Sequence, residues 1–175
     1  MTKCIFRAGF DWKVVEAKWD GFETAFHGFD PGRCAFMDDA EFDTLLSNPA
    51  LIRNSAKLAT VRDNAAFLLG LRDRGGAGKV LGGWPSTDYI GLLAFLQTEG
   101  ARLGGNTGQY AMRFLRRDAF ILSRDVTARL IAEGVIDRPA TSKSALAAVQ
   151  AAFNTWMEQS GRSLTEISQT LARSL

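Results

Sequence analysis

Small residues surround an expected helix start between Gly100 and Gly108, where the sequence reads GARLGGNTG. The apolar pattern of one helix ends at Gly100, and a new helix is expected to begin near Asn106 or Thr107. Glycines leave backbone N–H groups unobstructed, and the positive end of the helix dipole attracts an anion. Such a hairpin could bind one DNA phosphate without reading the bases. An ordinary tight turn between two helices is the simpler interpretation.

Arginines are concentrated around and after this turn. Six of them lie between Ala101 and Arg129 against two aspartates, so this stretch carries a net charge of +4, whereas the whole chain carries +2. Arginine stays charged and pairs with phosphate through two hydrogen bonds, which makes a polyanion the expected partner. A solvated helix face is the alternative. The residues predicted to bind DNA are Arg102, Gly104, Gly105, Asn106, Thr107 and Arg113.

Asp125 is the candidate catalytic carboxylate. It ends the segment Phe120–Asp125, directly before another helical pattern, and is expected at the N-cap or in the first turn of that helix. Asp is among the best N-cap residues and needs no further role there. A carboxylate beside a DNA-binding groove could instead stabilise an oxocarbenium ion at a sugar C1′ or orient a water molecule toward it. The sequence leaves both interpretations open.

An aromatic residue near the N-terminus is a candidate binding surface. Phenylalanine and tryptophan at helical spacing usually belong to a core. Trp12 differs because it follows Gly9 and Asp11 at a polar junction. A tryptophan at such a junction could form a stacking platform at the mouth of a pocket.

The rare residue types exclude several other sites. Two cysteines, Cys4 and Cys34, and one histidine cannot form a tetrahedral Cys/His zinc site by themselves. A Ser-His-Asp triad would depend on His27 alone. The longest apolar runs fall far short of the roughly 20 residues that span a bilayer, and the N-terminus lacks a secretory pattern. We therefore expect a monomeric cytoplasmic protein that does not bind membranes.

The elements that must position these residues are helices. Apolar residues recur every three or four positions, strand alternation is absent, and glycine and proline breaks divide the chain into about nine or ten helices. Predicted helices begin at Asp38, at Ser86 to Asp88, at Thr141 or Ser142, and at Ser163. The predicted fold is all-α, a compact multi-helix domain with a helix-hairpin-helix motif, and residues 1–175 are expected to form one domain.

Four segments together resemble the DNA-3-methyladenine glycosylase I family, a branch of the helix-hairpin-helix DNA glycosylases. The family patterns are Ala-Gly-Leu-Ser-Trp, Phe-x-x-Phe-Asp-Pro, Ile-Ile-Arg-x-x-x-Lys, and a hairpin ending in Thr-x-x-Tyr. The corresponding segments, in the same order, are Ala8–Trp12, Phe26–Pro31, Leu51–Lys57 and Gly100–Tyr110. The resemblance extends from about residue 5 to about residue 130.

This resemblance implies hydrolysis of the N-glycosidic bond of a 3-methyladenine-like alkylated purine in double-stranded DNA, during base-excision repair. The damaged nucleotide would be flipped into a pocket, and neither a metal nor another cofactor is expected. Trp12 matches the aromatic residue that lines the base pocket, and Phe10 is expected beside it. Cys4 stands where the family has a base-recognising glutamate, whereas Asp125 and Arg129 stand where it has a histidine and a cysteine that bind zinc.

Two other interpretations remain at this stage. Because Cys4 cannot replace the missing glutamate as a hydrogen-bond acceptor for an adenine amino group, the substrate could differ from that of the family. A noncatalytic helix-hairpin-helix protein that only binds DNA is the alternative function. The family's N-terminal aromatic residues and first zinc ligands have no counterpart in this chain, and the sequence leaves open whether a native N-terminal segment is missing.

Overall fold

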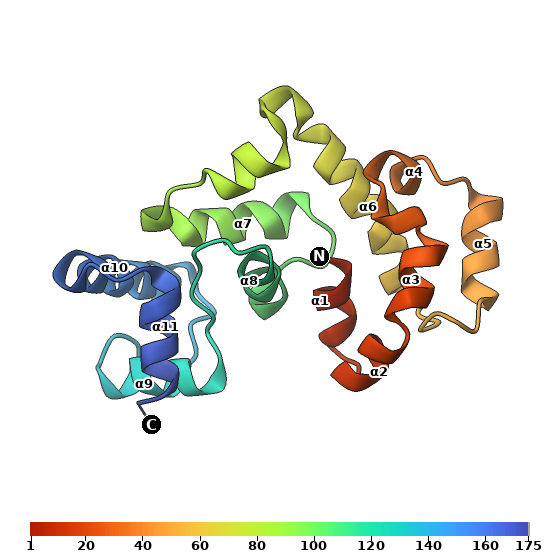
Figure 1. The fold of residues 1–175 in the computed structure, drawn as a ribbon. Helices are drawn as coiled ribbons and strands as arrows, with labels where there is room; N and C mark the ends of the chain where they lie inside the picture. Colours follow the sequence, from red (N-terminus) through yellow and green to blue (C-terminus); the bar gives the residue numbers. More distant parts are fainter. Residues whose placement is uncertain (175) are drawn as a thin grey trace. The chain divides into compact units, whose positions relative to one another are not determined.

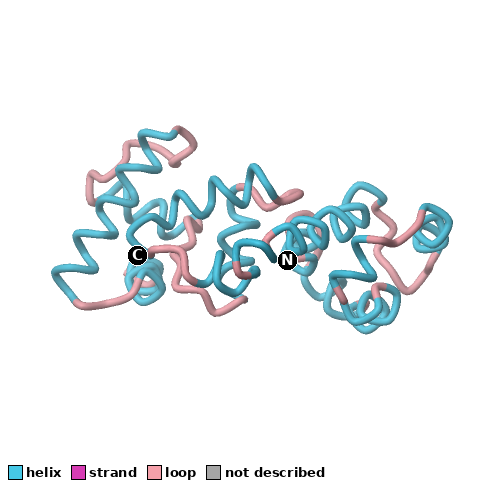
Figure 2. The backbone as a smooth tube through the Cα atoms, turned by 90° about the horizontal axis from the view of Figure 1, so that it is seen from above, coloured by secondary structure: helices cyan, strands magenta, loops and turns pink. Residues whose placement is uncertain are grey.

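The computed structural model describes residues 1–174, and all regular structure among them is helical. The all-α prediction is confirmed. Figures 1 and 2 show helices joined by short loops, with no strand among the described residues. The α-helices are α1 (Thr2–Arg7), α2 (Trp12–Ala17), α3 (Trp19–Ala25), α4 (Pro31–Ala35), α5 (Asp39–Ser47), α6 (Ser55–Gly70), α7 (Tyr89–Glu99), α8 (Gly105–Phe114), α9 (Arg124–Ala132), α10 (Lys143–Ser160) and α11 (Leu164–Ala172).

The chain forms two compact units. Unit 1 contains Met1–Gly83 and Leu96–Leu103, and unit 2 contains Trp84–Phe95 and the chain from Gly104 onwards. Helix α7 therefore contributes its first residues to unit 2 and its last residues to unit 1. The expectation of one domain over residues 1–175 stays a prediction. Among residues 1–174, no helix is both long and apolar enough to cross a membrane.

Unit 1 is built around aromatic side chains from its first three helices. Phe22 of α3 is fully buried and meets Phe6 of α1 edge-on, with 4.7 Å between ring centroids. Trp19 stacks on Phe22 and on Phe29 at 5.6 and 5.2 Å. Helix α6 packs against α1 and α4. This core fixes the α1–α2 corner, which carries Cys4, Phe10 and Trp12.

Apolar residues recur at helical spacing from Val14 to Phe26, but the structure divides this run at Lys18, whose φ and ψ are −102° and 2°. Val15 is buried, whereas Val14 is exposed. Periodicity alone therefore identifies the helical state and misses the corner.

Unit 2 has its own aromatic core. Phe120, from the segment between α8 and α9, lies 4.8 Å from Tyr89 and 4.4 Å from Phe153 of α10 between ring centroids. Helix α11 packs against both α9 and α10. The segment that leads to Asp125 is thus anchored in a core by its own phenylalanine.

Candidate functional site

The loop between α7 and α8 contains the predicted hairpin. In unit 1, the Asn64 amide of α6 accepts a hydrogen bond from the Ala101 N–H at 2.9 Å and donates one to the Ala101 carbonyl at 3.0 Å. A Cβ on Gly100 would lie 2.7 Å from Leu103 Cδ1 and 2.8 Å from the Leu96 carbonyl oxygen. This turn therefore requires glycine at residue 100.

The second half of the hairpin begins helix α8 in unit 2. Gly104 is the N-cap residue, and the start of α8 has neither a side-chain cap nor an acidic residue in its first turn. Gly105 has a φ of +55°, and a Cβ there would have nothing within 4 Å. Gly105 and Asn106 are exposed, whereas Thr107 is half-buried. The positive end of α8 is therefore open to an anion.

The predicted arginines differ in their surroundings. Arg102 lies in unit 1, is exposed and has a φ of +55°. Arg113 lies in unit 2, where its guanidinium donates to the Ala119 carbonyl, with the Nε–O distance at 3.1 Å. Burial lowers the pKa of Arg113. Arg117 likewise donates to the carbonyl of Trp84. Internal hydrogen bonds thus account for part of the cluster that the charge pattern assigns to DNA.

Asp125 lies in the first turn of α9 and is exposed. Its helix is capped by Ser123, whose Oγ accepts from the Val126 N–H at 3.3 Å. The first-turn position is confirmed, and the N-cap alternative is wrong because a serine two residues earlier has that role. The Asp125 carboxylate is therefore available for another role.

The segment that presents Asp125 is held from several sides. Gln109 of α8, a buried residue, accepts the Leu122 N–H at 2.6 Å. Ser168 of α11 accepts the Ile121 N–H at 3.1 Å. These bonds fix the backbone just before α9 although no regular element lies there. The sequence contains no signal for them, because a glutamine or serine does not reveal its backbone partner.

The three predicted base-pocket residues belong to the α1–α2 corner of unit 1. Cys4 is buried in α1, and burial raises the pKa of its thiol, which therefore stays neutral at pH 7. Phe10 is half-buried, with its centroid 6.2 Å from that of Phe6. Trp12 begins α2, is 46% exposed, and has the Arg7 guanidinium 4.6 Å from its ring centroid.

Lys57 of α6 supports this corner, a role that the Leu51–Lys57 motif does not predict. Its side chain is only 8% exposed, and its ammonium donates to the carbonyls of Ile5 and Ala8, the latter at 3.4 Å. It also lies 5.3 Å from the Phe10 centroid. Burial lowers the pKa of Lys57. The lysine that ends the Leu51–Lys57 motif thus binds the C-terminal end of α1. The negative end of the helix dipole stabilises a cation at this place.

No group of three or more histidine, cysteine, aspartate or glutamate side chains that could hold a metal ion occurs among residues 1–174. The thiol of Cys34 donates to the Phe26 carbonyl at 3.3 Å. His27 pairs with Glu41 at 2.6 Å between Nε2 and Oε1. Both residues are thus engaged within unit 1.

Residues 3–81 match the family described as methyladenine glycosylase. The DNA-3-methyladenine glycosylase of Haemophilus influenzae is 36% identical over 69 residues, which make up 39% of this chain and 37% of that protein. DNA-3-methyladenine glycosylase 1 of Escherichia coli is 29% identical over 69 residues, with the same shares. The chain thus matches little more than a third of the length of these curated relatives.

A crystal structure of 3-methyladenine DNA glycosylase I superposes with a TM-score of 0.51, covering 61% of this chain and 70% of that chain at 23% sequence identity. It shows a shared fold. The family match ends at residue 81, so it includes three of the four predicted motifs and leaves the Gly100–Tyr110 hairpin outside. The predicted resemblance is confirmed: over residues 3–81, the chain is similar to the methyladenine glycosylases.

Proposed function

We propose that this protein is a DNA repair glycosylase that hydrolyses the N-glycosidic bond of a 3-methyladenine-like alkylated purine in base-excision repair. The similarity of residues 3–81 to methyladenine glycosylases supports this reaction class. The observation that carries the proposal furthest is the exposed Asp125 carboxylate, which Ser123 relieves of the capping role. Its proposed partner is double-stranded DNA with a damaged base, bound by a cytoplasmic monomer.

DNA would bind at the open start of α8. A phosphate oxygen would accept hydrogen bonds from the first backbone N–H groups of the helix, with Gly104, Gly105, Asn106 and Thr107 around it. Arg102 of unit 1 and Arg113 of unit 2 are proposed as further phosphate contacts, each on its own unit. Arg102 is the stronger candidate because it is exposed, whereas Arg113 must share its guanidinium with the Ala119 carbonyl.

The reaction would need little acid assistance. When the C1′–N bond of a cationic alkylated purine breaks, its electron pair moves to the base, which leaves as a neutral molecule. The Asp125 carboxylate would stabilise the cationic sugar and orient a water molecule, whose oxygen bonds to C1′ and whose proton passes to the carboxylate or solvent. In unit 1, Trp12, Phe10 and Cys4 are the residues proposed to receive the extruded base, with the two aromatic rings stacking on it. Neither a metal ion nor another cofactor has a role in this scheme.

A noncatalytic helix-hairpin-helix protein that only binds DNA is the second candidate. The observation in its favour is Cys4, a buried neutral thiol at the position where the family carries a base-recognising glutamate. A thiol is a weak hydrogen-bond acceptor, so an adenine amino group would lose a partner there.

Release of bases from methylated DNA tests the proposal directly. Duplex DNA treated with a methylating agent is incubated with the protein, and the freed bases are separated by chromatography. We expect release of 3-methyladenine and new abasic sites. Binding to abasic duplex without release of any base from methylated DNA would instead establish the noncatalytic alternative. Elemental analysis of chelator-free protein is expected to show no stoichiometric zinc.

A further inference from the structure

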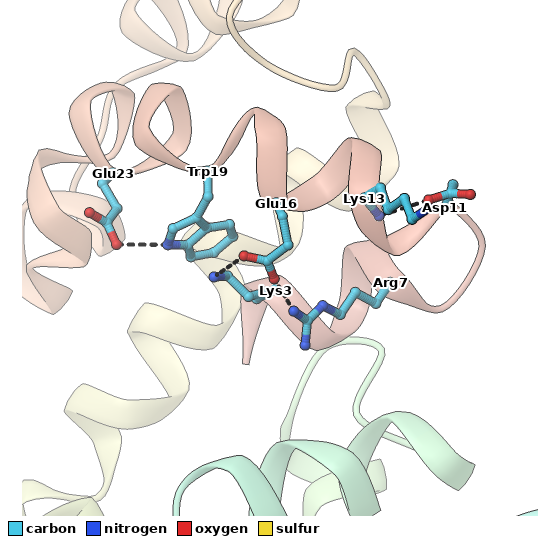
Figure 3. A network of polar contacts seen from close by, with 7 residues as sticks. All are labelled: Lys3, Arg7, Asp11, Lys13, Glu16, Trp19 and Glu23. Carbon is cyan, nitrogen blue, oxygen red and sulfur yellow. Dashed lines mark hydrogen bonds and ion pairs between the residues drawn. The ribbon is translucent and has the colours of Figure 1, made fainter.

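A polar network joins α1 to α2 beside Trp12. The side chains of Lys3 and Arg7 extend from α1 toward Glu16 of α2, as Figure 3 shows. Arg7 Nη2 pairs with Glu16 Oε1, and Lys3 Nζ pairs with Oε2 at 3.2 Å. The Arg7 side chain is only 14% exposed. One carboxylate thus holds two cations, each on its own oxygen.

Each cation also lies over an indole ring. Lys3 Nζ is 4.3 Å from the centroid of Trp19, and Arg7 Cζ is 4.6 Å from the centroid of Trp12. Trp19 belongs to the aromatic core, and its Nε1 donates to Glu23 at 2.7 Å. Trp12 is the more exposed of the two indoles. The Glu16 carboxylate thus holds Lys3 over Trp19 at the core and Arg7 over Trp12 at the surface.

The backbone below Trp12 is fixed separately. Asp11 caps α2 by accepting the Lys13 N–H at 2.7 Å, which sets the first turn of the helix. This cap sets the backbone and does not itself restrain rotation about the Trp12 side-chain bonds. A guanidinium that lies over the ring and is itself held by a carboxylate restricts that rotation, because turning the ring away would give up the cation–π contact.

We propose that Arg7 is a positioning residue for Trp12 and that Glu16 holds Arg7 in place. The inference rests on the proposed function, since it takes the exposed part of Trp12 as the surface on which a flipped purine stacks. Fixing the ring before the base arrives reduces the conformational freedom lost on binding. Arg7 therefore acts on substrate binding and leaves the bond-breaking step unchanged.

A purely structural role for Arg7 would be to join α1 and α2. Lys3→Met is the matched control. It also removes a cation from Glu16, but that cation lies over Trp19 and not over Trp12. If the network only joined the helices, loss of either cation would have similar consequences. The positioning role instead predicts that loss of Arg7, and not loss of Lys3, changes the setting of Trp12.

Kinetics on a methylated duplex provide the first readout. Arg7→Met keeps an unbranched side chain but removes the charged guanidinium. We expect it to raise KM about fivefold, which corresponds to the cost of ordering one side chain on binding. The value of kcat should stay nearly unchanged. Glu16→Gln should raise KM less. Arg7→Lys should retain more affinity than Arg7→Met because it keeps the charge. Lys3→Met should leave KM unchanged.

A second readout does not require catalysis. The chain contains four tryptophans, so 5-fluorotryptophan labelling should give four fluorine resonances, with Trp12 assigned by Trp12→Phe. Arg7→Met should shift and broaden the Trp12 resonance, whereas Lys3→Met should affect Trp19. Free 3-methyladenine should shift the Trp12 resonance of the unmodified protein more strongly than that of Arg7→Met.

The outcomes separate this inference from the proposed function. An unchanged Trp12 resonance in Arg7→Met, or an equal rise of KM in Lys3→Met, would overturn the positioning role even in an active glycosylase. If the unmodified protein releases no base, the proposed function fails, and the titration with 3-methyladenine still decides whether Trp12 binds a purine. Should Arg7→Met fail to fold, Arg7→Lys and Glu16→Gln carry the same comparison.

Discussion

Helices α8 and α11 of unit 2 begin in opposite ways. At α11, Asp118 accepts the N–H groups of Leu164 and Thr165 at 3.1 and 2.8 Å, and Ser163 and Glu166 form a capping box. The start of α8 has no side-chain cap and no acid in its first turn. Because the first N–H groups of any helix lack partners inside it, α11 satisfies them with side chains, whereas α8 leaves them without a side-chain acceptor.

Helix α9 combines both situations. Ser123 caps its backbone, so the exposed Asp125 next to it is not required as a cap. A carboxylate at a capped helix start is stabilised by the dipole while remaining accessible. The three helix starts thus differ in their caps: α11 is closed by side chains, α8 has no side-chain cap, and we propose that it binds a phosphate, whereas α9 has a serine cap beside the exposed Asp125.

Asp125→Asn is expected to have the largest effect. Removing the charge while keeping the size of the side chain should lower the rate of base release about a hundredfold or more, comparable to losing one preorganised electrostatic group. DNA affinity and folding should change little. Single-turnover kinetics on methylated duplex, with circular dichroism as a check on folding, would measure this.

Ser123→Ala is the control for Asp125→Asn. It removes the cap and should lower the free energy of unfolding by about 1 kcal/mol, while the rate of base release stays within a few-fold. If Asp125→Asn retained full activity in a well-folded protein, Asp125 would have no catalytic role. The acidic residue at the start of α9 would then have no function beyond the structural one of the acidic residues at the start of α11.

Asp118→Ala removes one of the two devices that close the start of α11 and leaves the Ser163–Glu166 capping box in place. Burial by itself would raise the pKa of Asp118, but hydrogen bonds from Thr165, Leu164 and Ser86 outweigh it and lower that pKa. Two backbone N–H groups would lose their acceptor, so the free energy of unfolding at pH 7 should fall by about 2 kcal/mol. Urea unfolding would measure the loss.

The same carboxylate predicts a pH dependence. A lowered folded-state pKa means that the stabilisation is complete above the usual carboxyl range and is lost as the pH falls through the lowered pKa. The difference in unfolding free energy between the unmodified protein and Asp118→Ala should therefore narrow as the pH falls below the usual carboxyl range and through the lowered pKa of Asp118. A constant difference across this range would show that Asp118 stabilises α11 without its charge.

Asn106→Asp makes α8 resemble α11 and should have the smallest effect. Asn106 is exposed in the first turn of α8, so a carboxylate there would occupy the positive end of the helix and repel a phosphate. We expect DNA to bind about fivefold more weakly, with thermal stability unchanged or slightly raised. Fluorescence anisotropy at low salt would measure the affinity. The neutral Asn106→Ser is the control, and equal weakening by both variants would contradict the phosphate site.

Local sequence signals predict the helices because caps act within a few residues. Asp38 and Ser163 cap α5 and α11 as predicted, and the turn before α7 lies at Ser86–Asp88. The predicted start of α8 near Asn106 or Thr107 differs from the observed start at Gly105 by one or two residues. Glycine at a helix start gives no propensity signal, which explains the shift.

The candidate site could be predicted only in part, because its supports join a helix to a loop or to another helix, and local sequence patterns do not reveal which residues meet there. The arginine count identifies a basic stretch, yet it cannot reveal that Arg113 binds the carbonyl of Ala119. The same limit applies to the bond between Gln109 and Leu122. Arg7 and Glu16 are nine residues apart, and only the corner between α1 and α2 brings them together.

The contact between Lys57 and the end of α1 also constrains the order in which the chain folds. It joins Lys57 to Ile5 across 52 residues, so the ammonium cannot reach that carbonyl until α6 has formed and docked. Closing so long a loop is slow compared with forming a helix. The α1–α2 corner should therefore acquire amide-exchange protection late during refolding. Phe10 and Trp12 in this corner would then be among the last residues of unit 1 to become ordered. They would also be among the first exposed to proteases when the unit opens.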